Sequence, residues 1–125
     1  MNTWVGHEAG LGASGQSNSQ NTGVGYRTGY SITTGSNNTF LGRQCGLVMT
    51  DGADNTFVGM NAGAGTVSGT KMVAIGNQSL FSNATTDATG TVAIGYEALN
   101  ALTIVTGKQF QHQHSFPQKC YLLRL

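Results

Sequence analysis

One short phrase recurs six times along this chain and ends in glycine each time. An aliphatic residue always precedes the glycine, and a Thr or Val stands three positions before it. The closing glycines are Gly6, Gly25, Gly42, Gly59, Gly76 and Gly95, so successive copies are 19, 17, 17, 17 and 19 residues apart. A near-constant period of this length predicts one small structural unit that stacks on copies of itself. Such a chain forms a rod or an extended surface rather than an enclosed pocket.

Each copy of the phrase predicts a short β-strand, because β-branched and aromatic residues dominate it. Glycine recurs too often within every long window for a helix to nucleate. The stretches between the strands are rich in Gly, Ser and Thr, which are turn residues. Parallel stacking of successive strands, about 4.8 Å apart, then gives a β-solenoid. The sequence therefore predicts an all-β solenoid of about six short coils, one for each 17–19-residue repeat.

Both faces of the predicted strands carry apolar residues. One face holds the Thr or Val together with the aliphatic residue, since side chains alternate along a strand. We take the aliphatic column of this face as the repeat core, namely Val5, Val24, Leu41, Val58, Ile75 and Ile94. The opposite face carries Trp4, Gly23, Phe40, Phe57, Ala74 and Ala93. A strand that is apolar on both faces is buried on both, so the face that does not line the coil needs a partner. Self-association into a closed dimer or trimer follows, and we favour a trimer.

Composition and charge exclude several functions. Charged residues make up 9% of the chain and the formal net charge is +1, whereas nucleic acids and anionic membranes are bound by clustered Lys and Arg. No apolar run reaches the roughly 18 residues of a membrane span, and the start does not resemble a secretory signal. Cys45 falls where other copies carry Ala, Thr or Ser, which predicts a small buried filler rather than a redox site.

No catalytic, cofactor-binding or metal site is predicted, so we expect neither an enzyme nor a cofactor. His112 and His114 lie two residues apart and near Cys120, but this spacing differs from that of zinc sites. Glu8 and Glu97 share one repeat position with Arg27 and with uncharged residues. That column is therefore interpreted as a variable solvated one rather than an acid–base pair.

Two copies of the repeat are continued in a distinctive way, as Met72–Ser79 and Thr91–Ala98. They resemble the motif Asn-Ser-Val-Ala-Ile-Gly, two variable residues and Ser, which is the head repeat of trimeric autotransporter adhesins, the YadA-like β-roll. The Asn-Thr-Phe-Val-Gly form resembles repeats of bacteriophage tail fibres and large bacterial surface proteins. The resemblance spans about residues 2 to 103. It implies a left-handed parallel β-roll that forms an obligate homotrimer and binds a host surface at the end of a fibre or stalk. The period here is longer than in the adhesin heads, so longer loops are expected.

We accordingly expect residues 1–107 to form the β-roll head repeats of a virion tail fibre or of a bacterial cell-surface protein. This chain carries no signal peptide, stalk or membrane anchor, which is expected of a fragment of a longer protein. Residues 108–125 form a tail of different composition that contains the only proline, Pro117. Two interpretations of this tail stay open: a cap over the last coil, or a frameshift product, because a one-base shift permits codons that would begin a seventh repeat.

The residue after each closing glycine varies, which is expected of outward positions. We predict a surface-recognition role for His7, Tyr26, Arg43, Met60 and Tyr96. Aromatic and Arg side chains in a rigid array suit contact with a host-surface glycan or protein. The leading interpretation is a receptor-binding head segment of a trimeric fibre or adhesin that mediates cell-surface attachment. The alternatives are a structural spacer without a ligand and an ice-binding solenoid with the Thr column as its surface. Thermal hysteresis would distinguish the ice-binding alternative, and we expect none, since burial of the Thr face is favoured.

Overall fold

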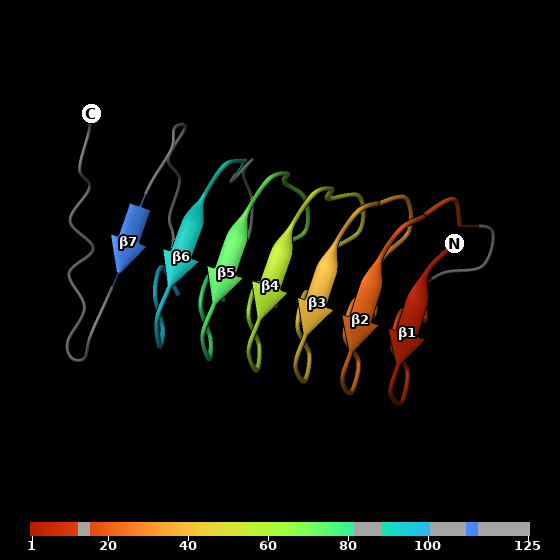
Figure 1. The fold of residues 1–125 in the computed structure, drawn as a ribbon, viewed down its shortest axis with the longest axis horizontal. Helices are drawn as coiled ribbons and strands as arrows, with labels where there is room; N and C mark the ends of the chain where they lie inside the picture. Colours follow the sequence, from red (N-terminus) through yellow and green to blue (C-terminus); the bar gives the residue numbers. More distant parts are fainter. Residues whose placement is uncertain (13–15, 82–88, 101–109, 113–125) are drawn as a thin grey trace.

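The computed structural model describes residues 1–12, 16–81, 89–100 and 110–112. These residues form seven short strands and no helix: β1 (Thr3–Val5), β2 (Thr22–Val24), β3 (Thr39–Leu41), β4 (Thr56–Val58), β5 (Val73–Ile75), β6 (Val92–Ile94) and β7 (Phe110–His112). They make one sheet in sequence order, as a single row of parallel arrows (Figure 1). The predicted all-β parallel solenoid with one coil per repeat is confirmed. The left-handed sense of the coil stays a prediction.

The register of the sheet pairs equivalent positions of neighbouring repeats. Thr22 of β2 lies beside Thr39 of β3, and Phe40 of β3 lies beside Phe57 of β4. At the far end, β7 pairs in parallel with β6 and sets Val92 beside Phe110. Three residues of the predicted 108–125 tail thus continue the stack. The rest of that tail lies outside the described residues, so both interpretations of it stay predictions.

Hydrogen bonds between coils also continue through the turns. The backbone N–H of Gly29 donates to the carbonyl oxygen of Cys45 at 2.9 Å, and that of Gly46 donates to Ala62 at 2.9 Å. Further round the coil, Thr33 donates to Thr50 at 2.8 Å. Each coil is therefore held to the next along most of its length, which makes the stack a stiff scaffold for exposed side chains.

The closing glycine of each strand is required by geometry. Gly42 has a φ of 140°, in the region that favours glycine. A Cβ atom added to Gly42 would lie 2.4 Å from the carbonyl oxygen of Gly59 in the next coil. Backbones of adjacent coils approach too closely there for any side chain. Gly6, Gly25, Gly59 and Gly76 make the same close approach to the next coil, which explains why glycine ends these copies of the repeat.

The interior of the solenoid lies on the strand face opposite to the one predicted. Phe40 and Phe57 are buried, with exposed fractions of 1% and 0%. By contrast, Val5 is 56% exposed and Leu41 is 48% exposed. The assignment of Val5, Val24, Leu41, Val58, Ile75 and Ile94 to the repeat core is therefore wrong for the single chain, in which this column lies on the outer face of the strands.

Buried amides explain which face turns inward. An Asn precedes each of the strands β1 to β4, two residues before the central strand residue, so both share one face. Asn38 is 1% exposed, and its Nδ2 donates to Asn21 Oδ1 at 3.0 Å and to the Gly52 carbonyl at 2.8 Å. Its Oδ1 accepts from the backbone N–H and the Nδ2 of Asn55, both at 3.0 Å. We call Asn21, Asn38 and Asn55 the asparagine ladder. These amides find hydrogen-bond partners on adjacent coils only when they point into the interior of the solenoid, so the strand face that they share is the one that turns inward.

Two combinations of strand and turn residue fill the interior of the third to sixth coils. In the fourth coil Phe57 lies against Gly63 of the following turn, where an added Cβ would be 2.3 Å from a ring carbon. In the fifth coil Ala74 replaces the Phe, and a buried Leu80 stands at the repeat position of Gly63. Volume lost on the strand is thus regained in the turn, which keeps the interior packed. We call these the Phe–Gly and Ala–Leu coils.

Candidate recognition surface

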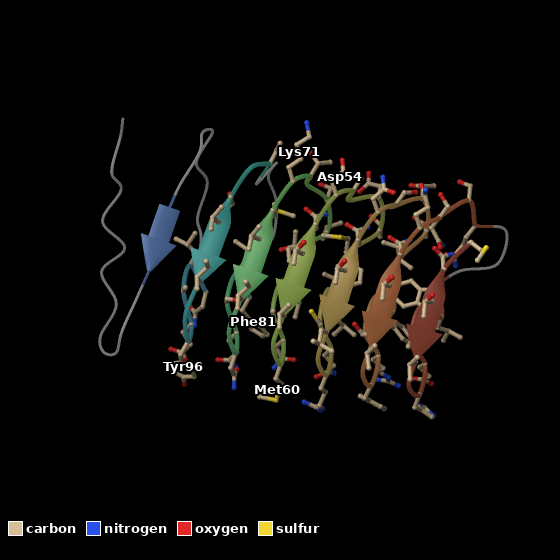
Figure 2. All side chains as sticks on the ribbon, in the orientation of Figure 1. Asp54, Met60, Lys71, Phe81 and Tyr96 are labelled. Atoms are coloured by element: carbon tan, nitrogen blue, oxygen red, sulfur yellow. The ribbon has the colours of Figure 1, made fainter. Side chains whose placement is uncertain are left out.

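The predicted recognition residues form a row along one edge of the solenoid, which we call the turn row. Each follows a closing glycine and stands at the start of the turn after a strand. All five are exposed: His7, Tyr26, Arg43, Met60 and Tyr96. Figure 2 shows Met60 and Tyr96 along this edge, with Asp54 and Lys71 along the opposite edge. The row is therefore accessible in the single chain.

The corner that presents this row uses two unusual backbone conformations in succession. The closing glycines have φ between 126° and 143°. The second residue after each glycine is also left-handed although it is not glycine, for example Arg27 with φ of 52° and Gln44 with φ of 54°. Hydrogen bonds between coils fix the corner, since Gln44 N–H donates to the Tyr26 carbonyl at 2.7 Å. The turn-row residues are thus held by backbone geometry rather than by a loose loop.

The structure brings three of the five predicted residues together. The rings of His7 and Tyr26 are stacked, with centroids 5.5 Å apart and an interplanar angle of 14°. The guanidinium carbon of Arg43 lies 5.9 Å from the centre of the Tyr26 ring. Met60 and Tyr96 occupy the same position in the fourth and sixth coils, further along the row.

Three other residues extend this group, namely Glu8, Arg27 and Tyr30, and their sequence positions did not predict a recognition role. Arg27 Nε donates a hydrogen bond to the carboxylate of Glu8, which raises the pKa of Arg27. The Arg27 guanidinium also lies 5.2 Å from the Tyr26 ring and 5.3 Å from the Tyr30 ring. Opposite charges at one repeat position in adjacent coils were the available signal for the Glu8–Arg27 pair. No repeat pattern indicated Tyr30. We call His7, Tyr26, Arg27, Tyr30 and Arg43 the aromatic–arginine cluster.

Tyr96, at the far end of the row, has a different neighbour. Its hydroxyl hydrogen-bonds to the adjacent Glu97 carboxylate, which raises the pKa of Tyr96. The Tyr96 side chain is 55% exposed. This tyrosine therefore stays protonated at neutral pH and presents an amphipathic ring to solvent.

A second candidate surface is the outer face of the strands, which we call the strand face. Its aliphatic column includes Val5, Val24, Leu41 and Ile75, each at least 38% exposed. Its other column starts with the exposed residues Thr3, Thr22, Thr39 and Thr56 and ends with the half-buried Val73 and Val92. The expectation that the Thr face is buried is therefore wrong within the single chain. The strand face is an exposed, largely apolar strip in the chain alone.

The thiol of Cys45 is confirmed as a buried filler. It is 0% exposed, and burial raises its pKa to about 12. At neutral pH it is therefore a protonated thiol rather than a nucleophilic thiolate. His112 lies in β7, where only the backbone is described, and His114 and Cys120 lie outside the described residues.

In the described ranges no helix is long and apolar enough to cross a membrane. Comparison of the chain with protein-family models, with curated proteins and with solved structures finds no match.

Proposed function

We propose that this chain is a structural and receptor-binding head segment of a trimeric fibre or adhesin that attaches to a cell surface. The observation that supports it most is the exposed apolar strand face running along consecutive coils. Monomeric soluble proteins rarely expose long contiguous apolar patches, and such patches mark interaction sites. The resemblance of the repeats to adhesin heads and tail fibres favours the same reading.

The strand face suits contact with other copies of the chain. Its aliphatic side chains recur once per coil, so a second copy in the same orientation meets them at the same spacing. Burial of apolar area stabilises such contacts by roughly 25 cal/mol for each Å² removed from water. Closed rotational symmetry covers the strand face of every copy. The arrangement we propose is three copies around one axis.

The turn row suits recognition because it lies beyond the ends of the strands. Copies that cover the strand face leave the turns accessible in this arrangement. The row combines aromatic, Arg and Met side chains, which are enriched where proteins contact partners. We propose a host-surface glycan or protein as the partner, and a virion tail fibre or bacterial cell surface as the location.

Assembly is tested by a charge on the strand face. Leu41→Asp places a carboxylate in the proposed interface of every copy, and an unpaired buried charge costs roughly 3–5 kcal/mol. We expect association to weaken by at least about a hundredfold, since about 1.4 kcal/mol is tenfold. Light scattering at fixed concentration measures the mass, and circular dichroism checks that the fold is retained.

Val67→Asp is the matched control for this experiment. Val67 is 42% exposed but lies outside the strand face, so its replacement should leave the mass unchanged. A wild-type chain that is a monomer at high micromolar concentration contradicts the proposed assembly. An assembled chain that adheres to no glycan or cell envelope leaves only the spacer role.

The exposed threonines favour a second candidate, an ice-binding face. Thr3, Thr22, Thr39 and Thr56 are paired in register on adjacent strands and form a regular row. Val73 and Val92 interrupt that row in the last two repeats, which is why we place this function second. We expect the wild-type chain to show no thermal hysteresis in a freezing assay. Hysteresis from a monomeric chain, abolished by Thr39→Glu, would reverse the order of the two candidates.

A further inference from the structure

The aromatic–arginine cluster sits on a rigid part of the stack. The backbone N–H of Arg27 donates to the His7 carbonyl at 2.9 Å, and Gln44 donates to the Tyr26 carbonyl at 2.7 Å. These bonds link the turns of the first three coils. On this backbone the Tyr26 ring is stacked with the His7 ring, and its centre lies 5.2 Å and 5.9 Å from the guanidinium carbons of Arg27 and Arg43. A site held on regular elements loses little conformational entropy when a ligand binds.

The two arginines of the cluster differ in whether their guanidinium group already has a carboxylate partner. Arg27 already donates to Glu8, and its guanidinium lies over two tyrosine rings. Arg43 is exposed, and within the described part of the chain it forms no ion pair with a carboxylate. Its planar group carries five N–H donors and is always charged at neutral pH. Arg43 is thus the cation of this surface that lacks an anionic partner.

An anion with a flat, partly apolar body matches this arrangement. A guanidinium binds carboxylate or phosphate oxygens through two parallel hydrogen bonds. Next to it, Tyr26 is 39% exposed and offers the edge of an amphipathic ring. A sugar ring with an acidic substituent has both features: its C–H groups contact the exposed edge of Tyr26, while the acidic group reaches Arg43.

We propose that the aromatic–arginine cluster is a binding site for anionic saccharides. Arg43 holds the acidic group, Tyr26 supports the sugar ring, and His7 and Arg27 hold Tyr26 in place. This inference rests on the proposed surface-attachment function and specifies the chemical class of its ligand.

The test is calorimetric titration of the full chain with two acidic sugars, sialyllactose and mannose 6-phosphate. Lactose and mannose are the neutral counterparts of these probes. We expect at least one acidic probe to bind, its neutral counterpart to bind at least about tenfold more weakly, and Arg43→Gln to weaken the acidic probe by about tenfold or more. Tyr26→Ala should weaken the same probe, and added salt should weaken it further.

Lys71→Gln is the matched control, because it removes one positive charge from the opposite edge of the solenoid (Figure 2). It should change the affinity by less than about twofold, since a separation beyond the Debye length of about 10 Å screens exposed charges. Equal losses for Arg43→Gln and Lys71→Gln overturn the site in favour of nonspecific charge attraction. Binding of neither acidic probe at millimolar concentration also overturns it, as does Arg43-dependent binding of a Glu-rich peptide alone.

Adhesion of the same proteins to cell envelopes separates this inference from the function on which it rests. Equal adhesion of the wild type and Arg43→Gln rejects the anionic-saccharide site while the attachment function stands. If the wild type adheres and Arg43→Gln does not, the result supports both the anionic-saccharide site and the attachment function. A wild-type assembly that adheres to nothing rejects both.

Discussion

Replacing Asn38 with alanine should lower the free energy of unfolding by about 4 kcal/mol. The substitution removes the middle rung of the asparagine ladder. It leaves the backbone N–H of Asn55 and the carbonyl of Gly52 without the partners that Asn38 provides. Each buried polar group that loses its partner costs roughly 1–3 kcal/mol, and two such groups give the expected loss. Urea unfolding followed by circular dichroism, at one fixed protein concentration, measures it.

Asn77→Ala is the matched control for this prediction. The side-chain carbonyl oxygen of Asn77 is buried, and in the described part of the chain it has no hydrogen-bond partner. Its removal should therefore cost less than about 1 kcal/mol, because no partner is orphaned. If Asn38→Ala and Asn77→Ala lower the unfolding free energy equally, the ladder is not a major source of stability.

The same ladder explains a change of residue along the chain. Asn55 is the last rung, and its Oδ1 accepts from the backbone N–H of Met72 at 2.9 Å. Met72 fills the equivalent space in the fifth coil with an apolar chain. Amide hydrogen bonding thus gives way to apolar packing at the point where Phe–Gly coils give way to Ala–Leu coils.

Replacing Phe57 with alanine should cost about 3–5 kcal/mol, the range measured for truncating a buried aromatic ring. Phe57 is fully buried and lies against Phe40, with ring centroids 5.6 Å apart. Gly63→Leu alone should also destabilise, because a Cβ there meets the Phe57 ring at 2.3 Å. The double variant Phe57→Ala/Gly63→Leu converts the fourth coil into an Ala–Leu coil. We expect it to regain about 2 kcal/mol or more relative to Phe57→Ala.

A double-mutant cycle measures this coupling, with urea unfolding of the wild type, both single variants and the double variant. Leu80 already occupies the equivalent position with a φ of 53°, and Gly63 has a φ of 61°, so the backbone need not change. A left-handed Leu costs of the order of 1 kcal/mol, which is why recovery should be incomplete. Strictly additive losses in the cycle would show that the two positions do not share one volume.

The repeat period and the residue types within it were enough to predict the solenoid, because each strand and each closing glycine recurs on schedule. They did not decide which strand face turns inward. Both columns are apolar, so hydrophobicity alone could not rank Val5 against Trp4. The deciding facts are the hydrogen bonds of Asn38 and the match between Phe57 and Gly63, and both depend on contacts between coils.

The candidate site was predicted in part. Variation between copies placed Tyr26 and Arg43 on the outside, where the structure has them. Their mutual contacts could not be predicted, since these depend on rotamers and on how each turn is rotated against the next. Tyr30 lies beyond the regular part of its repeat, so the periodic pattern offered no reason to place it near Arg27.

Because the coils stack in a common register, the number of repeats sets the length of the solenoid. Each further repeat advances the stack by one strand spacing, about 4.8 Å, and presents the same two surfaces in the same orientation. Gene duplication of whole repeats would therefore lengthen the shaft in fixed increments without redesigning its cross-section. In the proposed fibre, the length of the solenoid and the number of turn-row positions would then rise together, so that one genetic event changes both the distance spanned and the number of proposed binding sites.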